Sequence, residues 1–383
     1  MLAIGLMSGT SLDGIDAALV EIRPRGDGYA VEPHRFETRP FEGNLRDELL
    51  ALLPPNAGSV ECLARLNNRL GASYALAAKN VAGSAKPAFV ASHGQTVWHD
   101  GAAGITLQIG NAFTIREALE ATVCYDFRSA DTAAGGHGAP LVARVDALLL
   151  GNDREDRVAL NLGGIANVTL LRAGAPPEAA IAFDTGPANM LLDRFVAARS
   201  RNALSFDREG ALAAAGRVDD GLLAALISDE YFAASPPKTT GRERFGAQFL
   251  ARHSAEFARL STEDGAATLT ELTAASIAQA LARSGFSSAR VIVSGGGAHN
   301  HTLLARLAAR LDGARVETSD MMGIPIDAKE AMAFAVLGYE TLRGRAGNVP
   351  AATGAAHSAV LGAIAPYDLS TLLADIAREC AAR

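Results

Sequence analysis

Residues 2–22 read LAIGLMSGTSLDGIDAALVEI, two apolar segments joined by a short polar turn. In this turn glycines stand beside small hydroxyl residues, so several backbone N–H groups can converge on one point and bind phosphate oxygens. The turn is not a P-loop, because Ile15 and Asp16 occupy the positions of the Lys and the Ser or Thr of that motif. The alternating character of the next residues predicts a returning strand and not a helix, which excludes a dinucleotide fingerprint. The stretch therefore predicts a phosphate-binding hairpin, with an ordinary hairpin turn as the alternative.

The composition of the 383-residue chain is that of a compact soluble protein, with 49% hydrophobic and 20% charged residues. A chain of this length exceeds the usual size of one hydrophobic core, so two domains are expected. The net charge of -7 argues against nucleic acid or an anionic membrane as a main partner. No apolar stretch is long enough to span a bilayer.

The cysteines and the first residues of the chain indicate the compartment. Cys62, Cys124 and Cys380 are scattered and form no CxxC pair, which fits a reducing compartment and excludes a disulfide framework or a cysteine zinc site. The first basic residue is Arg23, so a signal peptide is not expected. These features predict a cytoplasmic protein.

The pattern of strand, glycine turn and strand returns at residues 158–171, where Gly163 and Gly164 form the turn. Short strands expected at 88–92, 122–125, 180–183 and 290–293 also end in polar or glycine residues, as at the binding edge of open α/β sheets. Apolar residues at helical spacing predict helices near 45–53 and 60–81. The repeat predicts two similar α/β domains that face each other. We place the first at 1–135, with a return of 355–383, and the second at 136–354, with an insertion at 200–246.

Nine motifs, taken together and in order, carry a resemblance to a known family. They are MSGTSLDGID, SHGQTVWH, TLQIGN, DFRSADTAAGGHGAPLV, LNLGGIANVT, FDTGPANMLLD, KTTGRERFG, SGGGAHN and GIPIDAKEAMAFA. From Gly5 to Ala335 the chain closely resembles the anhydro-N-acetylmuramic acid kinases, bacterial enzymes of cell-wall recycling. The resemblance implies two duplicated RNase H-like α/β domains of the sugar kinase, Hsp70 and actin type, with an interdomain cleft. It also implies ATP and Mg²⁺ as cofactors, a small sugar substrate and a homodimer.

The reaction that the resemblance implies converts ATP, water and 1,6-anhydro-N-acetylmuramic acid to N-acetylmuramic acid 6-phosphate and ADP. A carboxylate takes a proton from water that attacks C1, and the departing O6 receives the γ-phosphoryl group. Asp184 is the expected base, because the family's FDTG motif falls there and a strand-end carboxylate projects into the cleft. The alternative is that Asp184 or Thr185 caps a helix that begins at Pro187.

Two groups of residues resemble the family's nucleotide-binding segments. Gly163 and Gly164 resemble its second phosphate turn, and Gly295, Gly296, Gly297 and Asn300 resemble its adenosine-contacting segment. The residues that match its first phosphate loop are Gly9, Thr10, Ser11, Leu12, Asp13, Gly14, Ile15 and Asp16. The other interpretation, glycines that simply permit tight turns, is compatible with binding.

Thr96, Arg128 and Glu330 match positions at which the family holds the sugar, and a bidentate guanidinium at Arg128 suits the lactyl carboxylate of muramic acid. Without the resemblance these three residues are equally well explained as a strand-end hydroxyl, a structural ion pair and an acid on a helix surface.

The metal ligands stay undetermined, because Leu6 stands where related sugar kinases carry an Asp that helps to hold magnesium. His93, His99 and His137 have no metal-ligand spacing. We interpret these three histidines as residues of loops or of the cleft wall.

Three positions depart from the family pattern: Ala188 replaces the second glycine of DTGPGN, His137 the glutamine of GGQGAP, and Gly246 the asparagine that ends the GRE motif. These changes affect fine substrate geometry more than the reaction class.

Other functions remain open at this point. An aspartic protease would need a second Asp-Thr-Gly, which the chain lacks, so that interpretation requires a dimer. A non-catalytic nucleotide switch of the actin or Hsp70 kind would leave the sugar-side residues unexplained. Another sugar kinase of the same superfamily is the stronger rival.

Overall fold

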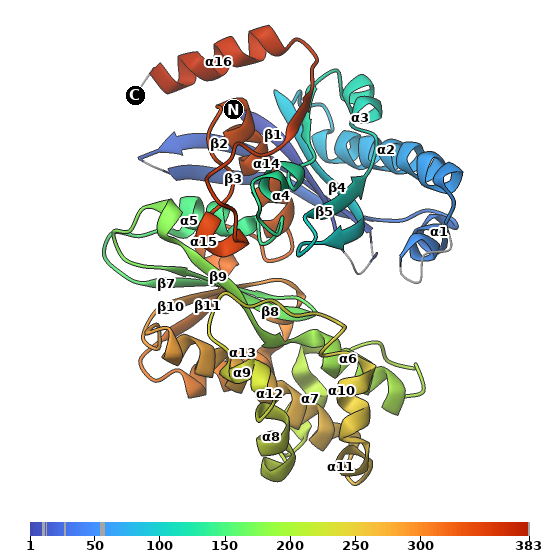
Figure 1. Cartoon of the computed structure of the whole chain (residues 1–383), viewed down its shortest axis with the longest axis vertical. Helices are drawn as coiled ribbons and strands as arrows, with labels where there is room; N and C mark the ends of the chain where they lie inside the picture. The colour runs from blue at the N-terminus through green and yellow to red at the C-terminus, as the bar shows by residue number, and fades with distance from the viewer. Residues whose placement is uncertain (10–11, 13, 27, 54–57, 382–383) are drawn as a thin grey trace. The chain divides into compact units, whose positions relative to one another are not determined.

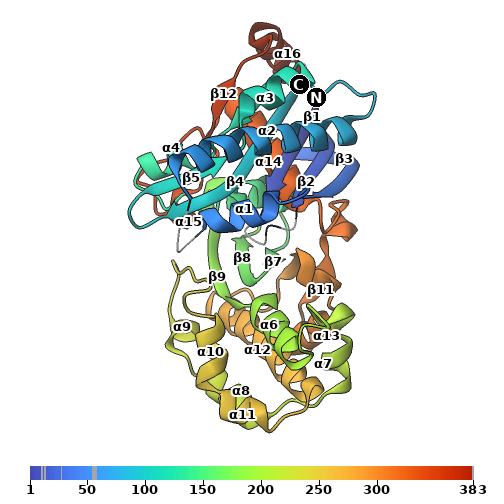
Figure 2. The same cartoon turned by 90° about the vertical axis from the view of Figure 1, so that its right-hand side faces the viewer.

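The computed structural model describes residues 1–9, 12, 14–26, 28–53 and 58–381 (Figures 1 and 2). The chain divides into two compact units. Unit 1 consists of Met1–Leu149 and Gly323–Arg383, and unit 2 of Leu150–Met322. Unit 1 is therefore built from two separate stretches of sequence.

Unit 1 contains a seven-stranded sheet in the order β12-β6-β4-β1-β2-β3, with β5 paired to β4. β1 runs antiparallel to β2 and parallel to β4, β2 runs antiparallel to β3, and β4 runs parallel to β6. β12 adds an antiparallel edge strand beside β6. The strands are β1 Leu2–Ser8, β2 Gly14–Arg25, β3 Gly28–Pro40, β4 Phe89–Asp100, β5 Ile105–Ile109, β6 Thr122–Tyr125 and β12 Ala363–Ala365.

Helices cover both faces of this sheet. Ile4 and Leu6 of β1 belong to the apolar core that α2 closes, whereas a Cβ on the intervening Gly5 would lie 1.8 Å from the carbonyl oxygen of Ala331 in α14. Because side chains alternate along a strand, α2 and α14 lie on opposite faces. The helices are α1 Leu45–Leu52, α2 Val60–Ala82, α3 Ala112–Leu119, α4 Ser129–Ala133, α5 Val142–Leu150, α14 Lys329–Leu342, α15 Pro350–Thr353 and α16 Leu369–Ala381.

Unit 2 contains a five-stranded sheet in the order β11-β10-β7-β8-β9. β7 is antiparallel to β8 and parallel to β10, β8 is antiparallel to β9, and β10 is parallel to β11. This order and these directions repeat those of β6-β4-β1-β2-β3 in unit 1, so the predicted duplication of an RNase H-like α/β fold is confirmed. The strands are β7 Arg157–Leu162, β8 Ile165–Leu171, β9 Ile181–Pro187, β10 Arg290–Ser294 and β11 Arg315–Thr318.

The helices of unit 2 include several short ones between β9 and α12, of which α7, α8 and α9 lie within residues 200–246 and α10 and α11 follow them. An apolar cluster joins α6, these short helices and α12, with Phe195, Phe232 and Phe249 among its buried members. The helices are α6 Asn189–Arg199, α7 Ala211–Ala215, α8 Asp220–Ile227, α9 Glu230–Ala233, α10 Ala247–Arg252, α11 Ser254–Ala258, α12 Thr262–Arg283 and α13 His301–Arg310.

Local sequence explains where the longest helices begin. Ser59 accepts a hydrogen bond from the Cys62 N–H at the start of α2, and Ser261 accepts one from the Asp264 N–H at the start of α12. Across the described ranges, no helix combines enough length and apolar character to cross a membrane.

The units divide the chain at other points than the domains expected from the sequence. The sequence places 136–149 and 323–354 in the second domain, but both belong to unit 1, and α14, which lies in the later stretch, packs on its sheet. Gly338 of α14 approaches the Ala91 Cβ of β4 closely, since a Cβ on it would lie 2.7 Å away. The close contact with the sheet sets this helix in unit 1, which the local sequence does not reveal.

Candidate active site

The first glycine turn follows β1 in unit 1 and is held by hydrogen bonds of Ser8, at the end of β1, and of Gln95 in β4. The Ser8 hydroxyl lies 2.6 Å from Oε1 of Gln95 and 2.9 Å from the Gly14 carbonyl oxygen, and Nε2 of Gln95 donates to the Gly9 carbonyl oxygen. Gly14 has no room for a side chain, because a Cβ would lie 2.4 Å from the Arg39 carbonyl oxygen. Of the predicted loop, Thr10, Ser11 and Asp13 lie outside the described residues.

The structure brings Asp16, at the start of β2, into the electrostatic surroundings of Glu330. Burial raises the pKa of Glu330, and the negative charge of Asp16 raises it further, whereas Lys329 and Arg128 lower it. Ile15 is buried in the core beside Asp16. The end of the hairpin and the predicted sugar-side acid therefore lie within one charged cluster of unit 1.

Arg128 is half-buried just after β6. Its Nε donates to Nε2 of His93 at 3.0 Å, and its Nη1 donates to the Gly138 carbonyl oxygen at 2.5 Å. Burial lowers the pKa of Arg128 to about 10, opposed by the acids Glu330 and Asp131, so the guanidinium stays charged at neutral pH. Thr96 lies on β4, where its hydroxyl accepts a hydrogen bond from Nε2 of Gln108.

The second glycine turn joins β7 to β8 in unit 2 and is fastened by its backbone. The Gly163 carbonyl accepts from the Asn189 N–H, and the Gly164 carbonyl accepts from the N–H groups of Ala188 and Met190, at the start of α6. The carbonyls are thus occupied by a helix N-terminus, which leaves the turn N–H groups as the donors for a ligand.

The third glycine run follows β10 and packs against the end of β7. Gly295 has φ +79°, and a Cβ there would lie 2.4 Å from Oδ1 of Asn161. A Cβ on Gly297 would lie 2.7 Å from the Leu162 Cβ, whereas a Cβ on Gly296 would meet no atom within 4 Å. Asn300 caps α13 by accepting a hydrogen bond from the Leu303 N–H. Two of these glycines are required by packing, and Gly296 is the one with open space above it.

Asp184 lies inside β9, where it pairs with Asn167 of β8. Its Oδ2 accepts a hydrogen bond from the Thr240 N–H at 2.9 Å, and its own backbone is bound on both sides, by the Lys238 carbonyl and the Tyr231 hydroxyl. Burial raises the pKa of Asp184 to about 6; the Thr240 N–H lowers it and Glu243 raises it again. This is a carboxylate that holds its proton to unusually high pH, as a tuned base does.

The capping alternative for this motif is wrong. The residue before α6 is Ala188, which makes no side-chain cap, and β9 continues through Pro187. Thr185 donates its hydroxyl to the Ala166 carbonyl across the sheet. Asp184 is therefore a strand residue whose carboxylate is held by the segment 238–240, which the sequence motif KTTGRERFG marks but to which sequence reasoning assigned no role.

The histidines behave differently from one another. His93 is buried within β4 and is no loop residue, because β4 runs on to Asp100 through its pairing with β5. His99 and His137 are exposed. In the described ranges of the chain no group of three His, Cys, Asp or Glu side chains could hold a metal ion.

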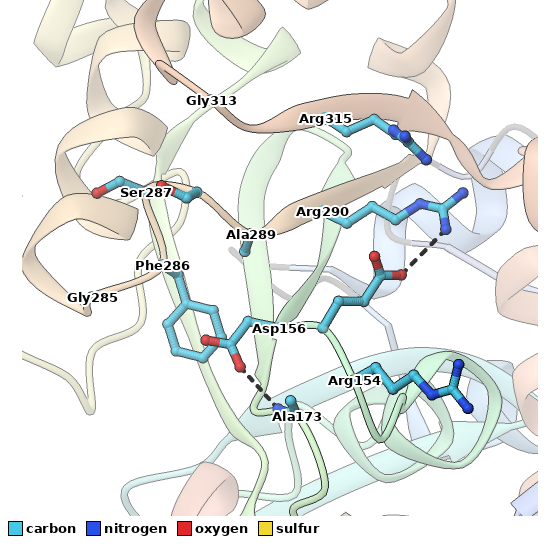
Figure 3. A pocket seen from close by; sticks show the side chains of 12 residues that line it. Arg154, Asp156, Ala173, Gly285, Phe286, Ser287, Ala289, Arg290, Gly313 and Arg315 are labelled. Atoms are coloured by element: carbon cyan, nitrogen blue, oxygen red, sulfur yellow. Dashed lines mark hydrogen bonds and ion pairs between the residues drawn. The ribbon is translucent and has the colours of Figure 1, made fainter.

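Two cavities lie within single units. One of about 130 Å³ in unit 1 is lined by His93, Ser92, Gln108 and Asp126, next to the predicted sugar-side residues. The other, of about 690 Å³ in unit 2, lies at the beginnings of β10 and β11 and is lined by Arg154, Arg290 and Arg315 (Figure 3). It contains none of the predicted site residues, because the glycine turns lie at the opposite ends of these strands.

Within each unit, a glycine turn follows the first strand of a duplicated sheet, and unit 2 adds a half-buried acid with a raised pKa. These features are those expected of an α/β phosphotransferase. The comparisons with known proteins agree: the family model for anhydro-N-acetylmuramic acid kinase matches residues 1–367. The chain belongs to the anhydro-N-acetylmuramic acid kinase family.

The relatives extend over nearly the whole chain. The anhydro-N-acetylmuramic acid kinase of Streptomyces coelicolor is 43% identical over 96% of this chain and 94% of its own. That of Xanthomonas axonopodis pv. citri is 45% identical over 95% of this chain and 98% of its own. Among solved structures, the ADPNP-bound activator of a 2-hydroxyisocaproyl-CoA dehydratase from Clostridium difficile covers 87% of this chain and 94% of its own, with 14% identity and a TM-score of 0.42.

Proposed function

We propose that this enzyme uses ATP and water to open 1,6-anhydro-N-acetylmuramic acid and to phosphorylate its O6, which yields N-acetylmuramic acid 6-phosphate and ADP. The observation that carries the proposal is the environment of Asp184, a half-buried carboxylate with a raised pKa, in a chain whose family is that of the named kinases. Such a reaction returns a cell-wall sugar to metabolism, and we place it in the cytoplasm.

Asp184 acts as the general base. The Thr240 N–H binds Oδ2, while Oδ1 has no hydrogen bond to any described residue and is free to accept a proton from water. The water oxygen forms a bond to C1 of the sugar, and the bond between C1 and O6 breaks. O6 then takes the γ-phosphoryl group, and ADP leaves.

The glycine turns bind the phosphates through backbone N–H groups. The hairpin from Gly9 to Asp16, with Gly163 and Gly164, surrounds the phosphate chain, and Gly295, Gly296, Gly297 and Asn300 line the adenosine. Occupied carbonyls at Gly163 and Gly164 support this role, because the turn then presents donors and not acceptors. The open space at Gly296 suits a close approach of the nucleoside.

The sugar is held by residues of unit 1. Arg128 offers its charged guanidinium to the lactyl carboxylate, while Thr96 and Glu330 bind sugar hydroxyls. Since the base belongs to unit 2, the reaction needs both units at one substrate. We therefore expect the units to close on the ligands, and identical small-angle scattering profiles with and without ATP and sugar would contradict this.

Magnesium fits the residues present. It is usually held by one or two carboxylates together with phosphate oxygens and water, so a cage of three acids is not required. Among the described residues, Asp16, two positions after Gly14, is a carboxylate that would hold the ion beside the first phosphate turn. When bound, the ion would offset the negative charge that develops on the phosphates. We also propose that the enzyme works as a homodimer, as its family suggests.

The experiment that tests the function is a phosphoryl-transfer assay with magnesium-ATP and a panel of sugars. The panel contains 1,6-anhydro-N-acetylmuramic acid, N-acetylmuramic acid and neutral hexoses, and the product is identified by mass. We expect a product heavier than the anhydro sugar by one water and one phosphoryl group. Phosphorylation of a neutral hexose in preference to the anhydro sugar would overturn the proposal in favour of another sugar kinase.

A further inference from the structure

His93 is a buried histidine of β4, with 2% of its surface exposed. Its Nδ1 lies 2.8 Å from the Gly94 carbonyl oxygen, and a carbonyl can only accept, so Nδ1 carries the hydrogen. Its Nε2 faces Nε of Arg128 at 3.0 Å, and a guanidinium can only donate, so Nε2 carries the lone pair. The two contacts define one neutral tautomer of His93.

The plane of the His93 ring is also fixed. The ring packs on Phe334 with centroids 4.6 Å apart, and Phe334 packs on Phe127, the residue before Arg128, at 5.5 Å. Phe334 lies one helical turn after Glu330 on α14, so both side chains point from the same face of that helix. Ring packing and hydrogen bonds therefore hold His93 and Arg128 in one rigid arrangement.

The hydrogen bonds decide which part of the guanidinium is available. Arg128 has five N–H donors. His93 takes the Nε hydrogen and the Gly138 carbonyl takes one of Nη1. Nη2 makes no hydrogen bond to any residue that the structure describes, and one Nη1 hydrogen remains. Two hydrogens of Nη2 and one of Nη1 are thus left to bind an anion.

The chemical nature of His93 as the hydrogen-bond partner of Arg128 matters as much as its position. An Asp or Glu at position 93 would hold the guanidinium equally firmly but would neutralise its charge. A neutral imidazole orients Arg128 and leaves its positive charge for a ligand. Burial and the adjacent Arg128 charge keep the His93 pKa well below its usual value, so the ring stays neutral at physiological pH.

We propose that His93 is the positioning residue that orients Arg128 to bind the substrate's carboxylate, so that the enzyme discriminates against anhydro sugars that lack this group. This inference rests on the proposed function, because it assigns Arg128 to the lactyl carboxylate. His93 acts through Arg128 and does not itself touch the sugar.

The test compares two substitutions on two substrates. His93→Gln places an amide oxygen near the position of Nε2, whereas His93→Leu keeps the volume but removes the acceptor. The substrates are 1,6-anhydro-N-acetylmuramic acid and 1,6-anhydro-N-acetylglucosamine, which lacks the lactyl group. We expect His93→Leu to lower kcat/KM for the first sugar about 10- to 100-fold through KM, as loss of one charged hydrogen bond does, with a much smaller change for the second.

The glutamine variant should recover most of this discrimination, and KM for ATP should stay constant in both variants. His34→Leu, at an exposed histidine of β3 in the same unit, serves as the control and should leave both sugars unaffected. Equal losses on both sugars would mean a purely structural role and would overturn the inference. So would wild-type discrimination in His93→Leu.

A measurement without turnover separates this inference from the proposed function. In ¹⁵N spectra of the full chain, we expect His93 to show a protonated Nδ1 and an unprotonated Nε2 at pH 7, and the Arg128 Nε–H resonance to move in His93→Leu. The opposite tautomer or a charged ring would overturn the positioning role even if the sugar were phosphorylated. If instead neither anhydro sugar is phosphorylated by the wild type, the proposed function fails, and the assignment of Arg128 to the carboxylate fails with it.

Discussion

The two sheets share one strand order, but they hold their first glycine turns by different means. In unit 1, the Ser8 hydroxyl and the Gln95 amide fasten the turn after β1 through side chains. In unit 2, the carbonyls of Gly163 and Gly164 accept from N–H groups at the start of α6, and the Asn189 side chain donates to the Leu162 carbonyl before the turn. A duplicated topology therefore fixes where a turn lies, while the element that holds it can differ: a neighbouring strand in unit 1 and a helix N-terminus in unit 2.

The largest effect is expected at Asp184, on β9 of unit 2. Asp184→Asn should lower kcat by about 10²- to 10⁴-fold, the range that general-base catalysis supplies. The amide oxygen can still accept from the Thr240 N–H, so the fold and the affinity for ATP should persist. Turnover with saturating ATP and sugar, together with a nucleotide-binding titration, measures both.

Asp193→Asn is the matched control, because Asp193 lies on α6 of the same unit and burial raises its pKa to about 7. It should retain activity near that of the wild type. Full activity in Asp184→Asn would remove Asp184 as the base.

The next effect separates glycines that packing requires from glycines that a ligand requires. Gly295→Ala should lower the melting temperature strongly, because φ is +79° and the Cβ would lie 2.4 Å from Asn161. Gly163→Ala has no atom within 3.4 Å and no positive φ, so its stability should change little. If its KM for ATP rises all the same, the added methyl group obstructs a phosphate and not the protein.

Thermal unfolding and ATP titration of the two glycine variants give the comparison directly. Equal destabilisation by both substitutions would contradict it.

A smaller effect is expected when the side-chain hydrogen bond that holds the first turn is removed. Ser8→Ala leaves the buried Gln95 oxygen without its 2.6 Å partner and should cost about 1–3 kcal/mol of unfolding free energy. KM for ATP should rise with it, because the turn loses its tie to β4. Ser294→Ala in unit 2 removes only a 3.4 Å contact to the Leu160 carbonyl and should change both quantities less. Denaturant unfolding and steady-state kinetics test the pair, and a larger loss in Ser294→Ala would reverse the comparison.

The smallest effect concerns the pH profile. With the Asp184 pKa near 6, kcat/KM should fall about tenfold per pH unit below pH 6, because the protonated acid cannot take the proton from water. Glu243 raises this pKa by its negative charge, so Glu243→Gln should move the acid limb to lower pH by a few tenths of a unit. A limb that moves upward would contradict this electrostatic role. Glu230→Gln, on another exposed acid of unit 2, should not move it.

The same pKa has a defined sign for stability. The folded-state pKa of Asp184 lies above the value of 3.8 for a free carboxyl. The contribution of protonated Asp184 to the free energy of unfolding is therefore fully present below about pH 4 and is lost as pH rises through 6. At pH 7 the Asp184→Asn variant should therefore be no less stable than the wild type.

The sequence predicts the duplicated α/β fold well, because the pattern of strand, glycine turn and strand returns at residues 158–171. It predicts the lengths of β4 and β9 poorly. Polar residues after Ser92 and at Asp184 suggested strand ends, yet both strands continue because a neighbouring antiparallel strand satisfies their backbone groups.

The candidate site is predictable residue by residue only where a motif marks it. The contact between Asp184 and Thr240 spans 56 positions, and that between His93 and Arg128 spans 35. No periodicity encodes such pairs, because they arise when separate strands and loops pack. The sequence therefore indicated Asp184 and Arg128 but not the residues that tune and orient them.

The placement of α14 on the first sheet has a consequence for biosynthesis. A ribosome releases residues 323–342 only after all of the intervening 150–322 has emerged. The strands that are translated first keep the α14 face of their sheet uncovered while a complete second sheet is made. The half that is translated first is thus the half that finishes folding last, and a stalled or truncated chain would expose the bare apolar face of its first strands to aggregation.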